Sequence, residues 1–580
     1  MRYHHYSNKE LADILREMAA FYEMEGVAFK PRAYERAADS IESLGNDVYD
    51  EYLEGGEKKL DEIPGIGSGI AEHLKELFVR GSFREYDAFR KKIPVKVLEL
   101  TGVEGVGPKT VKALWEKLKV KDVDDLERAL VRHRVAALEG FGPRSEEKMK
   151  KGIELYRQSN KRFVLGFILP TVSKLEENIK RIPTVSSVAV AGSVRRLKET
   201  VGDVDILVAA SGPERVMKEI TALPSVSFVY AEGPTKTNLR LASGIDVDIR
   251  IVPEASWGAA LNYFTGSKPH NIELRTLALK QGWKLSEYGL FRGEKMIAGK
   301  TEGELYRALG LRYIEPELRE MTGEIEAARE GRLPALVGYG DLKGDLHSHT
   351  DRTDGTASIE AMADAAEAAG LEYLAITDHT KALPMASGMN ETELLKHRAR
   401  IAEAQEKRAA AGKKLRLFSG VEANIMKDGS LDIDDAALAR LDIVGAAVHS
   451  HFGLPKKEQT ARVVRAMENP NVDIIFHLTG RLLGRRAPIE LDEDAVIAAA
   501  KRTGTILEID AFPERLDIGS ELIRKCVRAG VPMVVDSDAH SVDHFAALRL
   551  GLGQARRGWA EKKDILNTLP CAEFLRRLKR

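Results

Sequence analysis

The feature that most constrains the fold is a repeated rhythm in the C-terminal part of the chain. Beyond residue 340, a helical pattern follows each of seven short apolar segments: GDLHSHT, LEYLAITDH, LRLFSGVEAN, LDIVGAAVHS, VDIIFHLTG, TILEIDA and VPMVVDSDAH. Short apolar runs bounded by turn residues are typical of buried parallel strands. Seven strand-helix units therefore predict a parallel sheet that closes into a barrel, with its active site at the C-terminal ends of the strands.

Histidines gather at these strand ends, because nine of the 14 histidines lie after residue 340. In GDLHSHT, two histidines stand two residues apart on one face of a strand and suit one divalent ion, although two polar loop histidines would look the same. Together, six histidines and three carboxylates are enough for two or three divalent ions in mixed nitrogen and oxygen coordination. The candidate ligands are His347, His349, Asp354, His379, Glu422, His449, His477, Asp538 and His540, with His451 as an alternative to His449.

The front of the chain carries a different repeated motif. IPGIGSGIAEHL, VEGVGPKTVKAL and LEGFGPRSEEKM each place a hydrophobic-x-Gly-hydrophobic-Gly turn before an amphipathic helix. One such segment could be a simple link between helices, but three copies favour a shared function. The glycines leave backbone amides at a helix start free to hold a DNA phosphate without reading base sequence. The motif resembles the helix-hairpin-helix; the third copy is the weakest because its helix opens with charged residues.

Three carboxylates mark a second candidate site, in a sheet predicted from about residue 185. Asp203 and Asp205 in GDVDILV are two residues apart on a strand, so both point to one face. Asp248 in VDIRIVP lies among β-branched residues of a neighbouring strand. A lone Asp pair is often a solvated strand end. Three convergent carboxylates with the Gly-Ser turn of GSVRR nearby instead fit a two-Mg²⁺ site for phosphoryl transfer.

Length, charge and cysteine content narrow the class of protein. The 580 residues suggest about four domains. Lys plus Arg number 88 against 89 for Asp plus Glu, so any DNA contact must come from local patches or backbone amides. Two cysteines cannot form a disulfide framework, and no signal peptide or run of about 18 apolar residues occurs. We expect a cytoplasmic protein without a membrane role.

The order of these motifs identifies the front of the chain. GSVRR, then GDVDILV, VDIRIVP and YFTGS, resembles the polymerase X family of nucleotidyltransferases, the group of DNA polymerase beta, across about residues 1–325. The resemblance implies that Asp203 and Asp205 bind two Mg²⁺ or Mn²⁺ ions, and that Asp248 is a ligand and the base for the primer 3′-hydroxyl. It assigns Ser193 and Arg196 to the nucleotide triphosphate, Tyr263 and Phe264 of YFTGS to the sugar, and Asn271 and Arg275 to the minor-groove side of the new base pair. Gly266 of the same motif is also implied as a nucleotide contact.

Two departures from this family matter. Lys268 follows YFTGS where vertebrate relatives carry an acid, which bears on nucleotide preference. The first hairpin, PGIGSGIAEH, ends in His73 where members with 5′-deoxyribose-phosphate lyase activity carry the lysine that forms a Schiff base. An imidazole cannot form that imine, so lyase chemistry is in doubt, and Lys30 is either a phosphate contact or a substitute amine. The other DNA contacts implied are Gly65, Gly67, Gly105 and Gly107 of the first two hairpins.

The barrel resembles the PHP domain, a metal-dependent phosphoesterase family with a distorted seven-stranded barrel, over about residues 341–575. All nine of the family's ligand positions are filled here, although Leu478 stands where relatives usually have Pro. Such nitrogen-rich sites accept Mn²⁺, Zn²⁺ or Fe. The basic stretch GRLLGRR, with Arg481, Arg485 and Arg486, fits either a clamp for substrate phosphates or a solvated surface.

The expected fold is therefore multidomain: an all-α helix-hairpin-helix region, an α+β nucleotidyltransferase palm with a thumb, and a distorted (β/α)7 PHP barrel. The predicted limits are 1–90 for a lyase-like hairpin domain, 91–155 for helical fingers, 156–262 for the palm, 263–325 for the thumb, 326–343 for a linker and 344–575 for the barrel. Because LPALVGYGDLKG reads as an interdomain joint, we expect the two halves to act independently.

This layout is that of bacterial and archaeal family X polymerases. We expect a monomeric DNA repair polymerase that fills short gaps in primer-template DNA from deoxynucleoside triphosphates, with a 3′–5′ exonuclease in the barrel. The same barrel could serve as an abasic-site endonuclease or a 3′-phosphatase. The main alternative is a PHP phosphatase of small phosphate esters with a DNA-binding adaptor in front. A non-enzymatic DNA-bridging scaffold would leave twelve metal-binding side chains unexplained.

Overall fold

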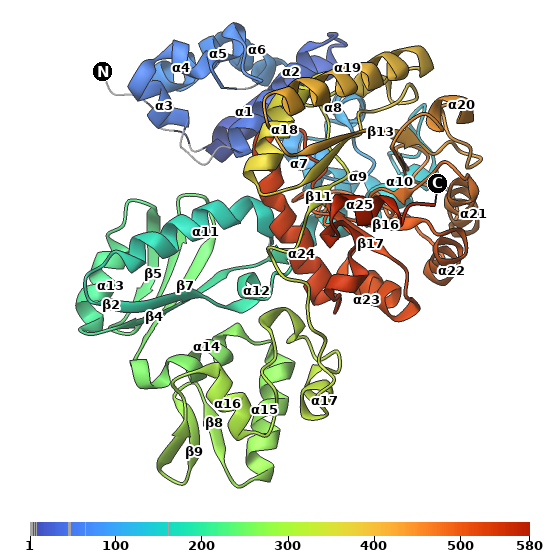
Figure 1. Ribbon diagram of the computed structural model, residues 1–580. Coiled ribbons are helices and arrows are strands. Elements are labelled where there is room, and N and C mark those ends of the chain that lie inside the picture. The colour runs from blue at the N-terminus through green and yellow to red at the C-terminus, as the bar shows by residue number, and fades with distance from the viewer. Residues whose placement is uncertain are drawn as a thin grey trace. The chain divides into compact units, whose positions relative to one another are not determined.

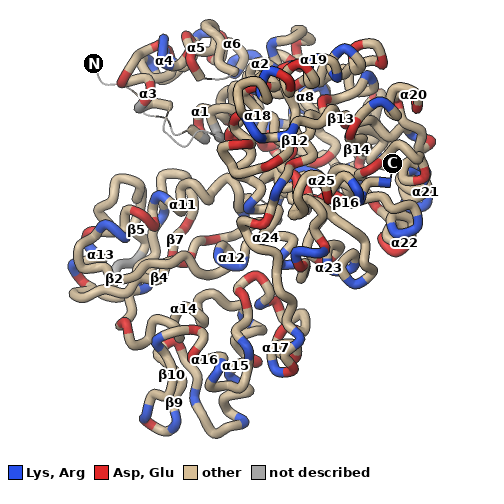
Figure 2. The backbone as a smooth tube through the Cα atoms, in the orientation of Figure 1, with Lys and Arg blue, Asp and Glu red and all other residues tan. Residues whose placement is uncertain are grey.

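The computed structural model describes residues 4, 6, 8–43, 48–63, 65–159 and 162–579. The chain divides into two compact units, Met1–Phe163 with Leu482–Ala487, and Val164–Arg481 with Pro488–Arg580 (Figure 1). Basic and acidic residues are interspersed along both (Figure 2), as the balanced composition requires. Within the described ranges, no helix is both long and apolar enough to cross a membrane.

The first unit is helical. Its helices are α1 Asn8–Met24, α2 Lys30–Ser43, α3 Val48–Gly55, α4 Glu57–Asp61, α5 Ser68–Arg80, α6 Arg84–Lys92, α7 Val97–Thr101, α8 Pro108–Leu118, α9 Val123–Val131 and α10 Pro143–Ser159. The apolar stripe of α1, with Leu11, Leu15 and Met18 fully buried, lies at the centre of their common core.

The three glycine motifs adopt one backbone conformation. Gly65, Gly105 and Gly140 have φ values of +83°, +87° and +84°, a region that disfavours side chains with a Cβ atom. Gly67 and Gly107 then stand immediately before α5 and α8, with no side chain capping either helix. The first-turn amides of both helices are therefore left without a capping side chain, as the motif predicts.

The palm of the second unit is a five-stranded sheet in the order β2-β4-β7-β6-β5. Strands β4 and β7 run parallel, and the other neighbours are antiparallel. The elements here are β1 Phe163–Val164, α11 Leu165–Lys180, β2 Val185–Val190, α12 Gly192–Arg195, β3 Thr200–Val201, β4 Val204–Ala210, α13 Pro213–Thr221, β5 Val226–Glu232, β6 Lys236–Leu241 and β7 Asp246–Val252.

The next segment packs a small antiparallel sheet, β10-β9-β8, among helices around its own apolar core. Its elements are η1 Glu254–Ser256, α14 Trp257–Thr265, α15 Lys268–Lys280, β8 Lys284–Ser286, β9 Gly289–Arg292, β10 Lys295–Ala298, α16 Glu302–Ala308, η2 Pro316–Leu318 and α17 Glu324–Arg329. The Gly-rich stretch that follows contacts the C-terminal end of the chain. Val337 N donates to Ala560 O at 3.0 Å, and Lys343 N donates to Asn567 O at 2.8 Å.

The seven predicted barrel strands are present and pair in chain order as parallel neighbours. They are β11 Gly344–Asp345, β12 Tyr373–Ile376, β13 Arg416–Asn424, β14 Ile443–Ala447, β15 Ile474–Ile475, β16 Ile506–Asp510 and β17 Met533–Asp536. A parallel bridge between Ser348 and Ala539 joins the extensions of the first and last strands, with His349 N donating to Ala539 O at 2.8 Å. This bridge closes the sheet.

Helices follow the strands around the barrel, as βαβ connections require. They are α18 Ile359–Ala368, η3 Pro384–Ala386, α19 Glu391–Ala410, α20 Asp435–Leu438, α21 Lys456–Glu468, α22 Glu493–Thr503, α23 Ser520–Ala529, η4 Val542–Ala547, α24 Leu548–Arg557, η5 Lys562–Asp564, η6 Leu566–Thr568 and α25 Cys571–Leu575. The predicted domain boundaries, including the limits of the barrel, stay predictions.

Two glycines make room for aromatic rings in the barrel core. A Cβ atom on Gly344 would lie 1.8 Å from the Tyr373 ring, and one on Gly445 would lie 1.8 Å from the Phe476 ring. Both rings are fully buried. Glycine at these positions lets a large ring lie flat over a neighbouring strand, which fills the barrel without voids.

We expect Gly445→Ala to destabilise the barrel by about 1–3 kcal/mol, because the new methyl group overpacks a rigid core. Thermal unfolding followed by circular dichroism measures the change. Gly453→Ala is the matched control, since a Cβ atom there would meet nothing within 4 Å. Equal midpoints for the two variants would contradict this account of the core.

Candidate functional site

The three palm carboxylates converge at one edge of the sheet. Asp203 lies in the bend before β4, and the strand register places Asp205 of β4 directly beside Asp248 of β7. The side-chain amide of Asn238, on the neighbouring strand β6, donates to Asp248 and helps to fix its orientation. The structure therefore brings together the three acids that the sequence singled out.

Their electrostatics indicate a need for positive charge. Burial, followed by the charges of Asp203 and Asp248, raises the pKa of Asp205 to about 7. Burial and the charge of Asp203 also raise the pKa of Asp248. Cations between the carboxylates would remove this repulsion, and oxygen ligands of this kind suit Mg²⁺ or Mn²⁺. The residues fit the divalent ions predicted for the site.

The turn between β2 and β4 lies against these acids. Gly192 has a φ of +59°, and a Cβ atom there would lie 2.0 Å from Oδ2 of Asp205. Only glycine lets the backbone approach so closely. Ser193 is in the same turn, and Arg196 follows it. Arg196 Nε donates to Glu320 at 3.0 Å and its Nη1 donates to Thr265 O.

The predicted sugar and base-pair contacts lie on α14 and α15, next to this turn. A Cβ atom on Gly266 would be 3.1 Å from Nη1 of Arg196, so the YFTGS segment lies beside the arginine. Asn271 Nδ2 donates to Tyr263 O at 2.6 Å, and the Arg275 guanidinium lies 5.6 Å from the centre of the Tyr263 ring. Phe264 packs edge-on against Tyr263.

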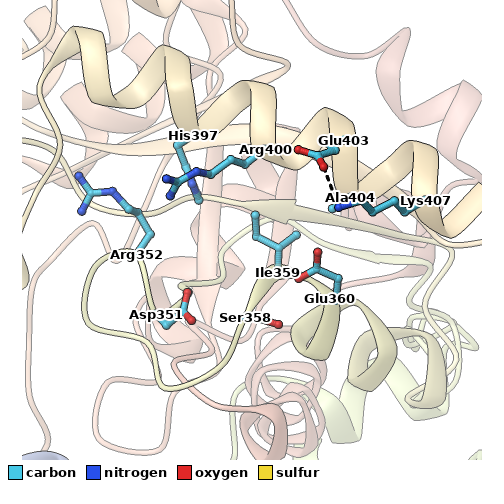
Figure 3. A pocket seen from close by; sticks show the side chains of 10 residues that line it. All are labelled: Asp351, Arg352, Ser358, Ile359, Glu360, His397, Arg400, Glu403, Ala404 and Lys407. Atoms are coloured by element: carbon cyan, nitrogen blue, oxygen red, sulfur yellow. Dashed lines mark ion pairs between the residues drawn. The ribbon is translucent and has the colours of Figure 1, made fainter.

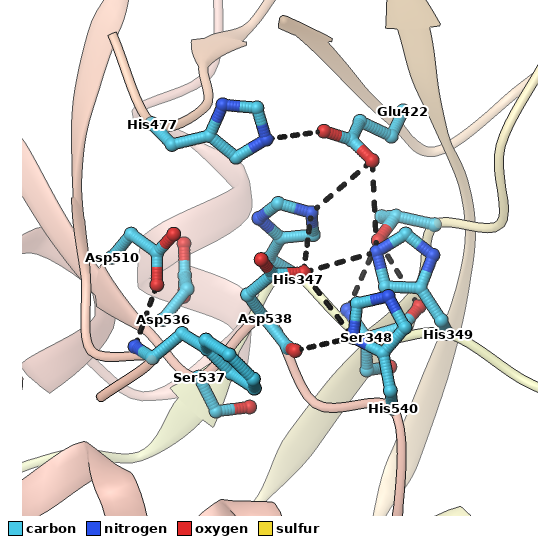
Figure 4. Close-up of polar contacts among 12 residues, drawn as sticks. His347, Ser348, His349, Glu422, His477, Asp510, Asp536, Ser537, Asp538 and His540 are labelled. Carbon is cyan, nitrogen blue, oxygen red and sulfur yellow. Dashed lines mark hydrogen bonds and ion pairs between the residues drawn. The ribbon is translucent and has the colours of Figure 1, made fainter. Parts of the chain in front are cut away.

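The nine predicted PHP ligands form one continuous cluster at the C-terminal end of the barrel strands. Figure 4 labels six of them: His347, His349, Glu422, His477, Asp538 and His540. Their ligand atoms fall into four groups within 4.8 Å: His349, Asp354, His379 and His540; His347, Glu422 and His477; His347, His349 and Asp538; and His379, Glu422 and His449. Because several residues belong to two groups, the cluster can hold more than one ion.

Glu422 is the residue that joins the groups. Its Oε1 lies 2.7 Å from His477 Nε2 and 3.1 Å from His449 Nε2. Its Oε2 lies 2.7 Å from His379 Nδ1 and 3.6 Å from the Nε2 atoms of both His347 and His349. A carboxylate with its two oxygens turned to different imidazoles is suited to bridge two cations.

The cluster contains buried atoms that lack hydrogen-bond partners. Among the described residues they include His347 Nε2, both ring nitrogens of His349, Asp354 Oδ1 and His477 Nδ1. Unpaired buried polar atoms are costly, and so many at one place indicate missing partners of another kind. Divalent cations would satisfy these atoms, so the residues present fit a PHP metal centre.

Burial and neighbouring charges lower the pKa of some histidines of the cluster and raise the pKa of others. Burial lowers the pKa of His349 to about 4, with the charges of His540 and His379 acting in the same direction. Burial also opposes the charged form of His540, but Asp354 and Asp538 outweigh it and raise its pKa to about 9. Despite burial, Glu422 and Asp354 likewise raise the pKa of His379. Without cations, protons occupy part of the centre.

The structure favours His449 over His451 at the position that the sequence left open. His449 Nε2 faces Glu422, and its Nδ1 lies 2.8 Å from Asn424 Oδ1. His451 is exposed, has a φ of +55° and belongs to none of the four groups found among the described residues.

The residues that orient the ligands are not among those that the sequence predicted. Glu508 on β16 accepts from the backbone N of His477 at 2.5 Å and lies 2.7 Å from Nδ1 of His347. Arg515 Nε lies 3.2 Å from Asp538 Oδ2. The acids of TILEIDA, at the end of a buried strand, were the available signal for Glu508. Such partners fix the tautomer and direction of a ligand.

A separate cavity of about 460 Å³ lies between α18 and α19 (Figure 3). None of the nine predicted ligands lines it. Its wall includes His397, whose Nε2 lies 2.8 Å from Asp378 Oδ2, and Asp378 in turn accepts from Thr350 and Thr353 in the ligand-bearing loop. These hydrogen bonds connect the cavity wall to the loop that carries His347, His349 and Asp354. The cavity itself is separate from the predicted metal centre.

In the first unit, the two predicted DNA-contacting side chains lie near one acid. Lys30 Nζ is 3.4 Å from Glu85, and His73 Nε2 is 3.9 Å from Glu85. His73 stacks on Phe83, with the ring centres 4.1 Å apart, and its Nδ1 lies 2.7 Å from Tyr34 Oη. Burial lowers the pKa of His73. His73 is thus fixed by its own neighbours, whereas Lys30 is half exposed.

We expect divalent ions to displace protons when they bind to the chelator-stripped barrel. With its pKa raised to about 9, His540 is mostly protonated near neutral pH, so the proton must leave before the nitrogen can bind a metal. As the pH is lowered, the apparent affinity for the metal should fall about tenfold per pH unit for each proton displaced. Calorimetric titration with Zn²⁺ in buffers of different ionisation enthalpy measures the release; identical heats in all buffers would contradict it.

Comparison with known families agrees with this geometry. A helix-hairpin-helix domain matches residues 6–83, a SAM-like helix-hairpin-helix tandem 97–154, the DNA polymerase beta thumb 260–320, and the PHP domain 345–499. These matches and the closed seven-stranded barrel confirm the predicted fold class.

Known proteins match the whole chain or parts of it. "DNA polymerase/3'-5' exonuclease PolX" of Bacillus subtilis (strain 168) is 35% identical over 580 residues, which cover 99% of each chain. "DNA polymerase lambda" of Rattus norvegicus is 26% identical over 54% of this chain and 56% of its own length. A "Probable phosphatase" of Acetivibrio thermocellus is 34% identical over 34% of this chain and 78% of its own length. A match this extensive to a full-length relative, over the same order of hairpins, thumb and barrel, means that the chain belongs to the family X DNA polymerases that carry a C-terminal PHP domain.

Proposed function

We propose that this enzyme is a DNA repair polymerase that fills short gaps by template-directed nucleotidyl transfer and trims 3′ ends with its PHP barrel. The observation that carries the proposal is the presence in one chain of two complete charged centres, the palm carboxylates and the nine-residue barrel cluster. The full-length relative from Bacillus subtilis carries both activities in its name.

In the palm, Asp203, Asp205 and Asp248 would hold two Mg²⁺ or Mn²⁺ ions. Bound there, the ions would stabilise the charge that develops on the attacking and leaving oxygens. Asp248 also accepts the proton of the primer 3′-hydroxyl. The raised pKa of its carboxyl group, caused by burial and Asp203, suits a proton acceptor.

The turn and α14–α15 bind the nucleotide. Ser193 and Arg196 hold the triphosphate, since Arg196 keeps its Nη2 without a partner among the described residues. The remaining contacts are Tyr263, Phe264 and Gly266 at the sugar, and Asn271 and Arg275 at the new base pair. Lys268, at the start of α15, adds a positive charge near this pocket.

The hairpins hold the DNA backbone. Gly65 and Gly67 in the first motif, and Gly105 and Gly107 in the second, present helix-start amides to phosphates. Lys30 and His73 supply a side-chain contact at a 5′-phosphate. His73 cannot form an imine, and its ring is held by Tyr34 and Phe83, so we propose a binding role rather than lyase chemistry for this hairpin.

In the barrel, the nine ligands hold two or three ions, with Mn²⁺, Zn²⁺ or Fe favoured by the imidazoles. Bound there, the ions would polarise a phosphate and lower the pKa of water. Cleavage at an abasic site hydrolyses a phosphodiester and removal of a 3′-phosphate hydrolyses a phosphomonoester; a phosphoesterase centre can serve both as further substrates. The phosphatase relative matches only 34% of this chain, and the alternative of a small-ester phosphatase leaves the palm carboxylates without a purpose.

Replacing Asp248 by Asn should lower single-nucleotide gap filling at least about a hundredfold, because a ligand charge at the transition state is lost. Exonuclease rates on the same DNA should stay within twofold. Asp246→Asn is the control, since Asp246 lies on the same strand but pairs with Arg240 at the surface. Normal extension by Asp248→Asn would show that the third carboxylate is misassigned.

The double change His347→Ala with His349→Ala should abolish 3′–5′ degradation, because it removes ligands from three of the four groups that could hold a metal. Gap filling should fall less than twofold. His451→Asn, at a position whose left-handed backbone Asn tolerates, is the control and should keep both activities. If the double variant degrades DNA at the wild-type rate, the exonuclease site lies outside the barrel, and the alternative of a small-ester phosphatase is favoured again.

A further inference from the structure

The turn that precedes the palm carboxylates contains two arginines with different surroundings. Arg195 is fully engaged: its guanidinium forms two bonds with the buried carboxylate of Glu302, at 2.9 and 2.7 Å. Arg196 is held only along one edge, by Glu320 and Thr265 O. Because Nη2 of Arg196 has no partner in the part of the chain that the structure describes, Arg196 is the arginine that can meet a triphosphate, and its direction depends on the turn.

Helix α24 of the barrel lies behind this turn and satisfies its backbone. Arg557 Nη1 donates to Arg196 O at 2.8 Å, and Gln554 Nε2 donates to Leu197 O at 2.9 Å. A Cβ atom on Gly553 would lie 2.6 Å from the Leu197 side chain, so the helix and the turn are in close contact. Residues 553, 554 and 557 share one face of the helix.

The turn adopts a conformation that needs such support. Leu197 is buried and has a φ of +51°, which is disfavoured for a side chain of this size. The carbonyls before and after this strained backbone are the two that α24 bonds. At the far end of the turn, Arg481 Nη2 forms a 2.7 Å ion pair with Glu199, so a second barrel residue holds the segment.

Arg557 also shares the counter-ion of Arg196. Oε1 of Glu320 lies 3.0 Å from Arg196 Nε and 3.2 Å from Arg557 Nη1. The side chain of Arg557 is only 7% exposed, so this contact is shielded from solvent. With Arg557 in place, one carboxylate is divided between two guanidinium groups, and Arg196 keeps more of its positive charge for a ligand.

We propose that Arg557 and Gln554, on a helix of the PHP barrel, position the triphosphate-binding turn of the polymerase site. The inference rests on the proposed role of Arg196. It makes nucleotide binding in the palm depend on the barrel, whereas the sequence led us to expect two halves that act independently. The barrel thus contributes to nucleotide binding in the palm whether or not its own phosphoesterase centre is active.

The test uses the full chain and single-nucleotide incorporation on gapped DNA over a range of nucleotide concentrations. Arg557→Ala should raise the KM for the nucleotide about tenfold with kcat changed less than twofold, and Gln554→Ala should act in the same direction more weakly. Exonuclease activity should stay within twofold, which shows that the barrel is folded. Arg549→Ala is the control, because Arg549 is an exposed arginine on α24 whose guanidinium faces Tyr339.

A double change separates positioning from general damage. Arg196→Ala alone should raise the KM, and adding Arg557→Ala to it should change the KM less than twofold, since the group being positioned is gone. If the KM of the double variant rises by the product of the increases seen in Arg196→Ala and Arg557→Ala, the inference is overturned. An unchanged KM in both Arg557→Ala and Gln554→Ala, with a raised KM in Arg196→Ala, would overturn it while leaving the proposed function intact. An unchanged KM in Arg196→Ala would remove the proposed role of the turn and the inference with it.

Discussion

The contact of one buried carboxylate with five imidazoles organises the C-terminal half of the molecule. Glu422 can meet His347, His349, His379, His449 and His477 only because the parallel strands end at the same edge of the barrel. Burying so many ionisable groups is tolerable only when their charges compensate one another. The palm follows the same rule with acids alone, and both centres place their uncompensated groups where cations would complete the balance.

The sequence predicted these centres well because their chemistry is local. A histidine at the end of an apolar strand, or an acid two residues from another acid, can be recognised in the sequence as a candidate metal ligand. Parallel strands then bring such residues together. The strand count, the clustering of nine histidines and carboxylates at one rim, and the pairing of Asp205 with Asp248 could all be predicted in this way. The glycine turns were equally predictable, since the positive φ of Gly65 and Gly105 is a property of a few neighbouring residues.

What the sequence could not predict are contacts between distant segments. Glu508 lies within an apolar strand and shows no periodicity that marks it as the partner of His347, 161 residues away. Arg557 reads as a surface residue in a helix, and its bond to Arg196 joins residues 361 apart. The Gly-rich stretch near residue 340 has the composition of a joint, but Val337 and Lys343 form hydrogen bonds with the end of the chain. Composition reports local flexibility and carries no information about packing partners.

The ring of Phe476 connects the packing of the barrel core to a predicted metal ligand at the rim. Phe476 lies over Gly445 on one side, and on the other it stacks against His347 with ring centres 3.8 Å apart. Since the core fixes this imidazole before any cation arrives, little reorganisation accompanies loading. The imidazole is therefore held by packing that does not depend on a bound ion, and we expect metal loading at the rim to leave the barrel core unchanged.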